Sequence, residues 1–188
     1  LVKNQAKTRD YSRKIEIVRL PEQGYIYFLT MGRMSVEKNH TALIKAFARL
    51  RKENENIRLV IIGAGPLEKQ IKALVDRENL CPYVTLTGNI DNPFVFMERS
   101  DCFILPSVHE GQPMVLLEAR VCGMPIIVSD FSTVNDSLYP DGQLLIGQDE
   151  ESIYEGLKAF TEGKVPKCDF NLQQYNQEAY EEFQTVIQ

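Results

Sequence analysis

Short apolar segments alternate with longer stretches of helical periodicity along this chain, and that alternation constrains its fold more than any other feature. The first segment, residues 25–30, is apolar and aromatic and lies between Gly24 and Gly32, which predicts a buried strand. Further strands are predicted at residues 58–62, 84–87, 102–105, 125–129 and 144–146. Strand–helix alternation at this spacing predicts an α/β domain with one parallel sheet, right-handed crossovers and helices on both faces.

The predicted helices lie between these strands. Apolar residues recur at positions i, i+3, i+4 and i+7 on one face of the first helix, namely Leu43, Ala46, Phe47 and Leu50. Pro66 is expected at the first position of the next helix. Further helical patterns cover residues 94–99, 114–121, 151–162 and 172–187. Ligands of a parallel sheet bind beyond the carboxyl ends of its strands, so the residues directly after each apolar segment are the candidates for a site.

The composition is that of a soluble globular domain, with 44% hydrophobic and 25% charged residues. No apolar run approaches the roughly 20 residues of a membrane-spanning helix. The net charge of −5 disfavours nucleic acid as a partner, because duplex binding depends on neutralising phosphates. We expect residues 1–20 to be a linker or an edge segment and residues 21–188 to form a single domain.

The four cysteines form no C-x-x-C pair and have no histidine partners at metal-binding spacing. Cys102 lies in an apolar segment and Cys122 among small residues, so both are expected to be buried, reduced thiols. Reduced thiols are typical of cytosolic proteins, which predicts a cytoplasmic location.

Residues 32–38 follow the first predicted strand and combine a glycine with two basic side chains. Gly32 lets the backbone approach a ligand closely, and Arg33 and Lys38 flank a loop that leads into a helix N-terminus. Because a helix N-terminus favours anions, an Arg fork and a Lys charge there would suit a diphosphate. The segment is not a Walker P-loop, since Glu37 and Asn39 replace the glycine and the Ser/Thr of that motif. Taken alone, it could equally be a solvated loop.

The second predicted strand ends in Gly63-Ala64-Gly65. This is a weak match to a dinucleotide-binding turn, because Glu68 stands where the third glycine would be. A tight strand-to-helix turn is the favoured interpretation, although the backbone there could also approach a ligand.

Two glutamates eight residues apart follow the fourth predicted strand, in a segment punctuated by glycine and proline. Glu110 lies in the loop at the carboxyl end of the strand, and Glu118 lies inside an otherwise apolar helix. A carboxylate between Leu117 and Ala119 is costly to bury unless it accepts hydrogen bonds, which sugar or ribose hydroxyls could donate. The alternative is one carboxylate that caps the helix and a second one on its solvated edge.

The neighbours of Glu110 divide into two groups. Gly111 and Gln112 leave backbone N–H groups near the helix start, where they would suit phosphate oxygens. Ser107 lacks the G-x-S-x-G context of a nucleophile and is interpreted as a turn residue. His109 adjoins Glu110, but a structural or incidental role is favoured for it.

Together these motifs resemble glycosyltransferase family 4, a family of GT-B fold. The matching motifs are G-R-x-S-x-E-K, G-A-G-P, residues 84–88 and P-S-x-x-E-G-x-P-x-x-L-L-E-A, in the order of the family over residues 25–130. The resemblance implies the Rossmann-like C-terminal, donor-binding domain of a retaining glycosyltransferase, an enzyme that transfers a sugar from a nucleotide-sugar to an acceptor.

The resemblance also implies a role for each candidate residue. Glu110 would be the catalytic-site residue that contacts hydroxyls of the transferred sugar, and Glu118 would contact the ribose. Arg33 and Lys38 would hold the diphosphate. The base would lie near Asn89 and Ile90. Further contacts to phosphate and sugar are expected from Gly32, Gly111, Gln112, Pro113, Met114 and Val115.

A metal-independent reaction without a cofactor is implied as well, because Arg33, Lys38 and a helix N-terminus would meet the charge on the leaving diphosphate. No D-x-D motif follows a strand, and the only two histidines, His40 and His109, form no metal cluster. Glu110 would orient the sugar while the acceptor attacks from the face of departure, which retains the anomeric configuration.

GT-B enzymes hold the acceptor on an N-terminal domain, and no part of this sequence resembles that domain. We therefore expect a missing N-terminal domain of the same polypeptide as a partner, and a UDP- or GDP-linked sugar as co-substrate. The acceptor could lie near the inner face of a membrane. Two alternatives stay open: a non-catalytic nucleotide-sugar-binding module, and a GT-B epimerase or phosphorylase relative, which the Glu-x7-Glu spacing disfavours. The sugar, the base and the acceptor are not indicated by the sequence.

Overall fold

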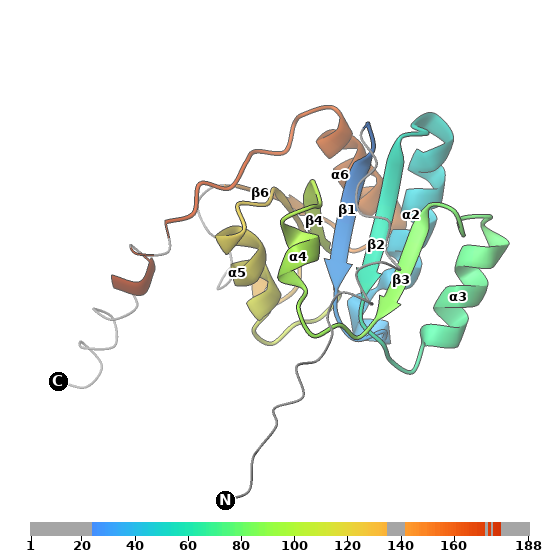
Figure 1. The fold of residues 1–188 in the computed structure, drawn as a ribbon, viewed down its shortest axis with the longest axis horizontal. Helices are drawn as coiled ribbons and strands as arrows, with labels where there is room; N and C mark the ends of the chain where they lie inside the picture. The colour runs from blue at the N-terminus through green and yellow to red at the C-terminus, as the bar shows by residue number, and fades with distance from the viewer. Residues whose placement is uncertain (1–23, 135–141, 172, 174, 178–188) are drawn as a thin grey trace, which may run out of the picture.

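The computed structural model describes residues 24–134, 142–171, 173 and 175–177 of the chain. Within these ranges six strands form one sheet in the order β3-β2-β1-β4-β5-β6, and all neighbouring strands are parallel (Figure 1). The predicted parallel α/β sheet is therefore confirmed, and each strand lies within one residue of its predicted bounds. The strands are β1 (Ile26–Met31), β2 (Ile57–Ile62), β3 (Val84–Gly88), β4 (Cys102–Leu105), β5 (Ile126–Ser129) and β6 (Gln143–Ile146).

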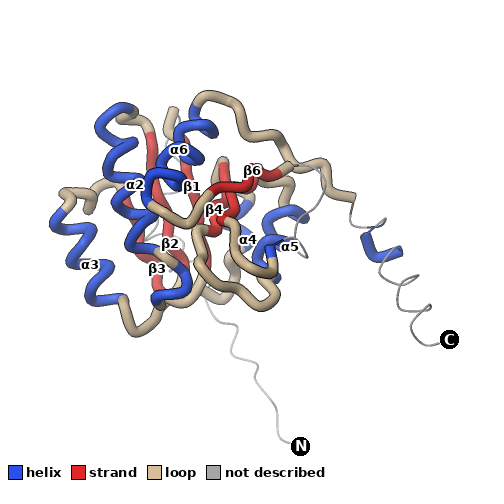
Figure 2. Tube along the Cα trace, turned by 180° about the vertical axis from the view of Figure 1, so that it is seen from behind, coloured by secondary structure: helices blue, strands red, loops and turns tan. Residues whose placement is uncertain are grey.

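Helices cover both faces of the sheet. Figure 1 shows α4 and α5 in front of it, and Figure 2 shows α2, α3 and α6 in front of its other face. None of the helices in the described ranges is both long and apolar enough to span a bilayer. The helices are η1 (Val36–Lys38), α2 (His40–Glu53), α3 (Glu68–Arg77), α4 (Phe94–Met97), α5 (Met114–Val121) and α6 (Glu150–Thr161).

Two predicted segments fall wholly or mostly outside the described residues. The linker or edge segment predicted over residues 1–20 lies outside them. Of the helix predicted over residues 172–187, only residues 173 and 175–177 are described, and these are helical.

Alternate side chains of the strands pack into two hydrophobic cores, one under each helical layer. In β1, Phe28 lies in the core beneath α2, α3 and α6, whereas Leu29 lies in the core beneath α4 and α5. The apolar face predicted for α2 is buried in the first of these cores. Because both faces of the sheet are covered, its strands are nearly continuous apolar runs, which explains why the sequence predicts them so closely.

The expected position of Pro66 is wrong, because α3 begins two residues later, at Glu68. The intervening turn is bonded to the loop after β1: the N–H of Leu67 donates to the carbonyl of Met34 at 2.9 Å. The N–H of Glu68 then closes the turn on the carbonyl of Gly65 at 3.1 Å. This tertiary contact keeps Pro66 and Leu67 in a turn, so the helix begins two residues later than Pro66 indicates.

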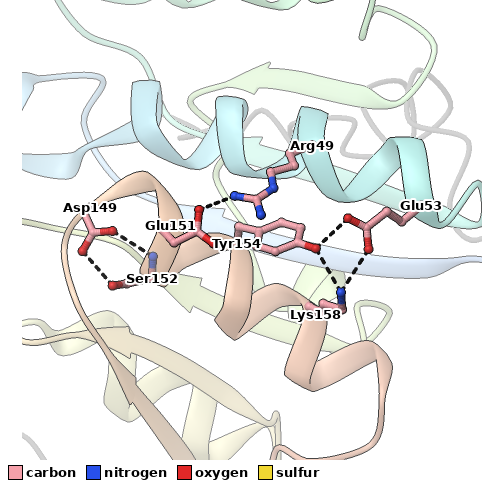
Figure 3. Close-up of polar contacts among 7 residues, drawn as sticks. All are labelled: Arg49, Glu53, Asp149, Glu151, Ser152, Tyr154 and Lys158. Carbon is pink, nitrogen blue, oxygen red and sulfur yellow. Dashed lines mark hydrogen bonds and ion pairs between the residues drawn. The ribbon is translucent and has the colours of Figure 1, made fainter.

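A row of polar contacts joins α2 to α6 on the outer face of their layer (Figure 3). The hydroxyl of Tyr154, a buried residue of α6, donates to Oε1 of Glu53 in α2 at 2.6 Å. The ammonium of Lys158 lies 3.1 Å from Oε2 of the same glutamate. The guanidinium of Arg49 stacks 3.8 Å from the centroid of the Tyr154 ring and pairs with Glu151. These contacts fix the last described long helix against the first.

All four cysteines of the chain are free thiols. Cys102 is buried as expected, whereas Cys122 is only partly buried. Burial raises the pKa of both thiols, that of Cys102 most strongly, and so favours their protonated form.

Candidate active site

The order of the strands puts the switch point of the sheet between β1 and β4, where a ligand-binding crevice is expected. From β1 the chain continues to β2 on one side, and from β4 it continues to β5 on the other side. Loops that leave two neighbouring strands in opposite directions diverge at the carboxyl edge of the sheet, where ligands of such sheets bind. The arrowheads of β1, β2 and β3 mark this edge at the bottom of Figure 1.

The loops after β1 and β4 bring a lysine and a glutamate together in this crevice. Lys38 ends η1, which follows β1, and Glu110 lies in the loop that follows β4. The Nζ atom of Lys38 lies 2.6 Å from Oε1 of Glu110. The two loops are also joined through their backbones, since the N–H of Val108 donates to the carbonyl of Glu37 at 2.8 Å. The G-R-x-S-x-E-K segment and the segment that contains Glu110, far apart in the sequence, are therefore in direct contact.

Glu110 is 8% exposed, and two donors contact the same oxygen of its carboxylate. Besides Lys38, the hydroxyl of Ser107 donates to Oε1 at 2.6 Å. The backbone of Glu110 is held as well, because the hydroxyl of Thr133 donates to its carbonyl at 2.7 Å. In the part of the chain that the structure describes, no donor contacts Oε2. That oxygen can therefore accept a hydrogen bond from a ligand hydroxyl.

Gly32 gives the side chain of Lys38 room to reach Glu110. A Cβ atom added at Gly32 would lie 3.2 Å from both Cδ and Cε of the lysine. Arg33, the next residue, is exposed, and among the described residues it forms no hydrogen bond or ion pair. Its guanidinium is thus available to an anion at the mouth of the crevice.

The loop after β1 is fixed by the turn after β2. The N–H of Met34 donates to the carbonyl of Ala64 at 3.0 Å. Gly63 adopts a φ of +135°, and a Cβ atom at Gly65 would lie 2.5 Å from the carbonyl oxygen of Met34. The two glycines therefore allow two loops to pack backbone against backbone, which supports the structural interpretation of the G-A-G turn.

The N-terminus of α5 faces the same edge with free backbone donors. Its cap residue, Pro113, offers no side-chain cap, and its first turn contains no acidic residue. Among the described residues, the N–H groups of Gly111 and Gln112 donate to no backbone carbonyl. Met114 is exposed and Val115 is partly buried. An uncapped helix start with free N–H groups is suited to phosphate oxygens.

Glu118 lies one turn inside α5 and is partly buried. Within the described ranges, no side chain or backbone group donates a hydrogen bond to its carboxylate. A partly buried carboxylate without a protein donor is costly unless a ligand or water satisfies it. Its placement fits a contact with ligand hydroxyls, and the structure does not bring it into contact with Glu110.

Asn89 and Ile90 follow β3 at the same edge. Two strand spacings, about 10 Å, separate β3 from β1, so these residues lie farther along the crevice than Lys38. Asn89 is exposed, whereas Ile90 packs partly into the core beneath α4 and α5.

Two residues that the sequence analysis did not assign to the site hold its loops in place. Ser107, interpreted as a turn residue, is the second donor to Glu110. Gln148 follows β6, and its side-chain amide donates to the carbonyls of Asp130 and, at 3.4 Å, of Val108. The side chain of Asn39 donates to the carbonyl of Gln148 at 2.8 Å. Gln148 thus links the loops after β1, β4, β5 and β6, and no sequence motif marks it.

The two histidines occupy different environments. His40, at the start of α2, is 2% exposed, and its Nδ1 has no hydrogen-bond partner among the described residues. Burial, together with the charge of Lys38, lowers the pKa of His40 to about 4. His109 is exposed. Hydrogen bonding to Ser35 lowers the pKa of Glu37, and the charges of Arg33 and His109 lower it further.

The described residues are poorly suited to a metal site or to a second pocket for a phosphorylated ligand. Across the described residues, no three His, Cys, Asp or Glu side chains gather in a geometry that could hold a metal ion. An open groove of about 440 Å³ lies between β6 and α6, away from the crevice. Its charged side chains are Glu151 and Glu155, which disfavour a phosphorylated ligand.

The parallel sheet with helices on both faces is the Rossmann-like α/β architecture found in glycosyltransferases of GT-B fold. The family model of the glycosyl transferases group 1 matches residues 12–179, and the chain belongs to that family.

Two relatives and one solved structure show the extent of the similarity. The chain is 34% identical over 139 residues to the Campylobacter jejuni N-acetylgalactosamine-N,N'-diacetylbacillosaminyl-diphospho-undecaprenol 4-alpha-N-acetylgalactosaminyltransferase, covering 72% of this chain and 37% of that one. It is 32% identical over 158 residues to the Escherichia coli UDP-Gal:alpha-D-GlcNAc-diphosphoundecaprenol alpha-1,3-galactosyltransferase, covering 81% and 40%. The C-terminal domain of the Francisella tularensis glycosyl transferase group 1 family protein LpcC superposes with a TM-score of 0.68 at 17% identity, covering 82% and 83%. The chain thus spans about two fifths of the length of the two relatives and matches most of the LpcC C-terminal domain in fold.

Proposed function

We propose that this chain is the donor-binding domain of a retaining glycosyltransferase of family 4, and that it binds a UDP-linked sugar. The ion pair of Lys38 with Glu110 carries the proposal, because it joins a group suited to phosphate and a group suited to sugar hydroxyls at the switch point of the sheet. The UDP specificity is supported by the name of the E. coli relative, which gives UDP-Gal as its donor.

In this proposal the diphosphate lies between Arg33, Lys38 and the N-terminus of α5. The free N–H groups of Gly111 and Gln112 would bind phosphate oxygens. Glu118 would accept hydrogen bonds from the ribose, and the base would lie toward Asn89 and Ile90.

In this proposal the domain contributes to the reaction by stabilising the leaving diphosphate. As the bond from the sugar to the diphosphate breaks, negative charge grows on the diphosphate, and the two cations and the helix N-terminus oppose it. No step of this scheme requires a metal ion. Oε2 of Glu110 would accept a hydrogen bond from a sugar hydroxyl and orient the sugar for attack on the face of departure.

The acceptor would be held by another domain of the same polypeptide, N-terminal to this one. Both relatives act, by name, on saccharides linked to diphosphoundecaprenol. A lipid-linked saccharide at the cytoplasmic face of a membrane is therefore the acceptor class that we propose.

A nucleotide panel tests the proposal. Thermal-shift and calorimetric titrations with UDP-, GDP-, ADP- and CDP-sugars should show binding of UDP-sugars by this chain, without transfer. The complete polypeptide should transfer the sugar and give an α-linked product from an α-linked donor. Binding of no nucleotide, or robust transfer by the 188-residue chain alone, would contradict the proposal. Absence of both transfer and donor hydrolysis in the complete polypeptide would point to a non-catalytic binding module.

A further inference from the structure

Ser107 is a fully buried serine directly beside the proposed sugar-binding glutamate. It lies at 0% exposure in the loop after β4, and its hydroxyl is 2.6 Å from Oε1 of Glu110. A buried hydroxyl normally bonds to a nearby backbone carbonyl. Here it donates instead to the carboxylate that the proposed function places on the sugar.

The two hydrogen-bond donors to Glu110 differ in whether they also bind another group in the proposed function. Lys38 and Ser107 both contact Oε1, each at 2.6 Å. In the proposed function Lys38 also binds the diphosphate, so its hold on the carboxylate weakens as the leaving group gains charge. The hydroxyl of Ser107 has no such competing partner. The Ser107 hydroxyl can therefore hold Oε1 of Glu110 while the leaving group departs, and thereby keep Oε2 turned toward the sugar.

The backbone around this contact is fixed without the Ser107 hydroxyl. The hydroxyl of Ser129 donates to the carbonyl of Ser107 at 2.5 Å and to that of Leu105 at 3.1 Å. At the other end of the turn, the hydroxyl of Thr133 donates to the carbonyl of Glu110 at 2.7 Å. Removing the Ser107 hydroxyl should therefore release the carboxylate and leave the loop in place.

We infer that Ser107 is a positioning residue for sugar recognition, which acts by fixing the carboxylate of Glu110. The inference rests on the proposed function. It predicts that Ser107 affects binding of the sugar moiety only, and only while Glu110 carries its charge.

Calorimetry on the 188-residue chain tests this with UDP, UDP-galactose and UDP-N-acetylgalactosamine as probes. Ser107→Ala and Ser107→Cys should each weaken UDP-sugar binding about 3- to 10-fold, the value of one hydrogen bond, and change UDP binding less than twofold. Ser107→Thr, which keeps the hydroxyl, should bind UDP-sugars as tightly as the unaltered chain does. Ser132→Ala, at an exposed serine, serves as the matched control.

A double-mutant cycle separates positioning from general structure. Ser107→Ala combined with Glu110→Gln should bind UDP-sugars no more weakly than Glu110→Gln alone. Additive losses, or equal losses for UDP and UDP-sugars, would overturn the inference while leaving the proposed function intact. If the unaltered chain bound none of the probes, or if Glu110→Gln left UDP-sugar binding unchanged, the proposed role of Glu110 would fail, and the inference with it.

Discussion

Lys38 and Glu110 lie 72 positions apart in the chain, yet their side chains meet with 2.6 Å between Nζ and Oε1. Side-chain exposure is 22% for the lysine and 9% for the glutamate, so each largely compensates the charge of the other. A diphosphate that binds Lys38 must share it with Glu110. The pair is thus at once a structural contact between two loops and a competitor for the proposed ligand.

Replacing Lys38 should therefore affect stability as well as binding. Lys38→Ala leaves a nearly buried carboxylate with only the Ser107 hydroxyl, which should lower the free energy of unfolding by about 1–3 kcal/mol. Arg33→Ala should change it by less than about 0.5 kcal/mol, because Arg33 is exposed and unpaired among the described residues. Both variants should weaken UDP binding by about 1.5–3 kcal/mol.

Urea denaturation and calorimetry measure the two effects separately. Lys38→Ala combined with Glu110→Gln should recover part of the lost stability, since it removes the uncompensated charge. Equal stability of the Lys38 and Arg33 variants would show that the ion pair does not support the loops.

The turn after β2 should matter for the site although it touches no proposed ligand. A methyl group at Gly65 would meet the backbone of Met34 at 2.5–2.9 Å, and backbone atoms cannot move aside as a flexible side chain can. Gly65→Ala should therefore cost about 1–3 kcal/mol of stability and weaken UDP binding by displacing the loop that carries Arg33. Gly111→Ala is the control for stability, because nothing lies within 4 Å of its added Cβ. A fully stable Gly65→Ala protein would contradict the close packing of the loops.

The sheet could be predicted because its strands are buried on both faces and therefore appear as unbroken apolar runs. Lys38 and Glu110 could each be predicted from their place after a strand, but their contact depends on β1 and β4 being neighbours, which no local pattern encodes. Gln148 was missed for the same reason, since its partners are backbone carbonyls in other loops. Ser107 was missed although its partner Glu110 is only three residues away, because the sequence does not indicate that the loop turns the hydroxyl toward the carboxylate. The start of α3 was misplaced because a tertiary hydrogen bond to Met34 outweighs the preference of Pro66.

His40 should make the domain less stable in acid. Its pKa is about 4 in the fold and 6.5 as the reference value, so the folded protein prefers the neutral ring. The stability that this preference gives is fully present above pH 6.5 and is lost as the pH falls toward 4, where the unfolded chain binds the additional proton. The loss is on the order of 3 kcal/mol.

Urea denaturation between pH 7 and pH 4 measures this dependence. His40→Gln should flatten the curve over that range, whereas His109→Gln, at an exposed position, should leave its slope unchanged. Parallel curves for the unaltered protein and His40→Gln would show that His40 does not titrate in this window.

The hydroxyl of Tyr154 should contribute to the docking of α6 on α2 (Figure 3). Tyr154→Phe keeps the buried ring and its stacking with Arg49 but removes the donor to Glu53. The hydroxyl also accepts a hydrogen bond from Lys158 at 3.1 Å, so the variant loses two hydrogen bonds. The melting temperature should therefore fall by about 4–8 °C in a domain of this size. Nucleotide binding should not change, because the contact lies outside the crevice. A loss of UDP affinity without a change in melting temperature would contradict this purely structural role.

Glu110 and Glu118 should separate the sugar from the nucleotide. Glu118 lies in α5 with no described protein donor, so Glu118→Gln should weaken binding of UDP and UDP-sugars alike, by about tenfold. Glu110→Gln should not weaken UDP binding, because it removes the carboxylate that competes for Lys38, but it should weaken UDP-sugar binding. In the complete enzyme Glu110→Gln should lower kcat more than it raises KM, since a contact that tightens at the transition state acts on kcat. Calorimetry on the four protein–ligand combinations decides the assignment: loss of UDP binding in Glu110→Gln, with normal binding in Glu118→Gln, would reverse the two roles.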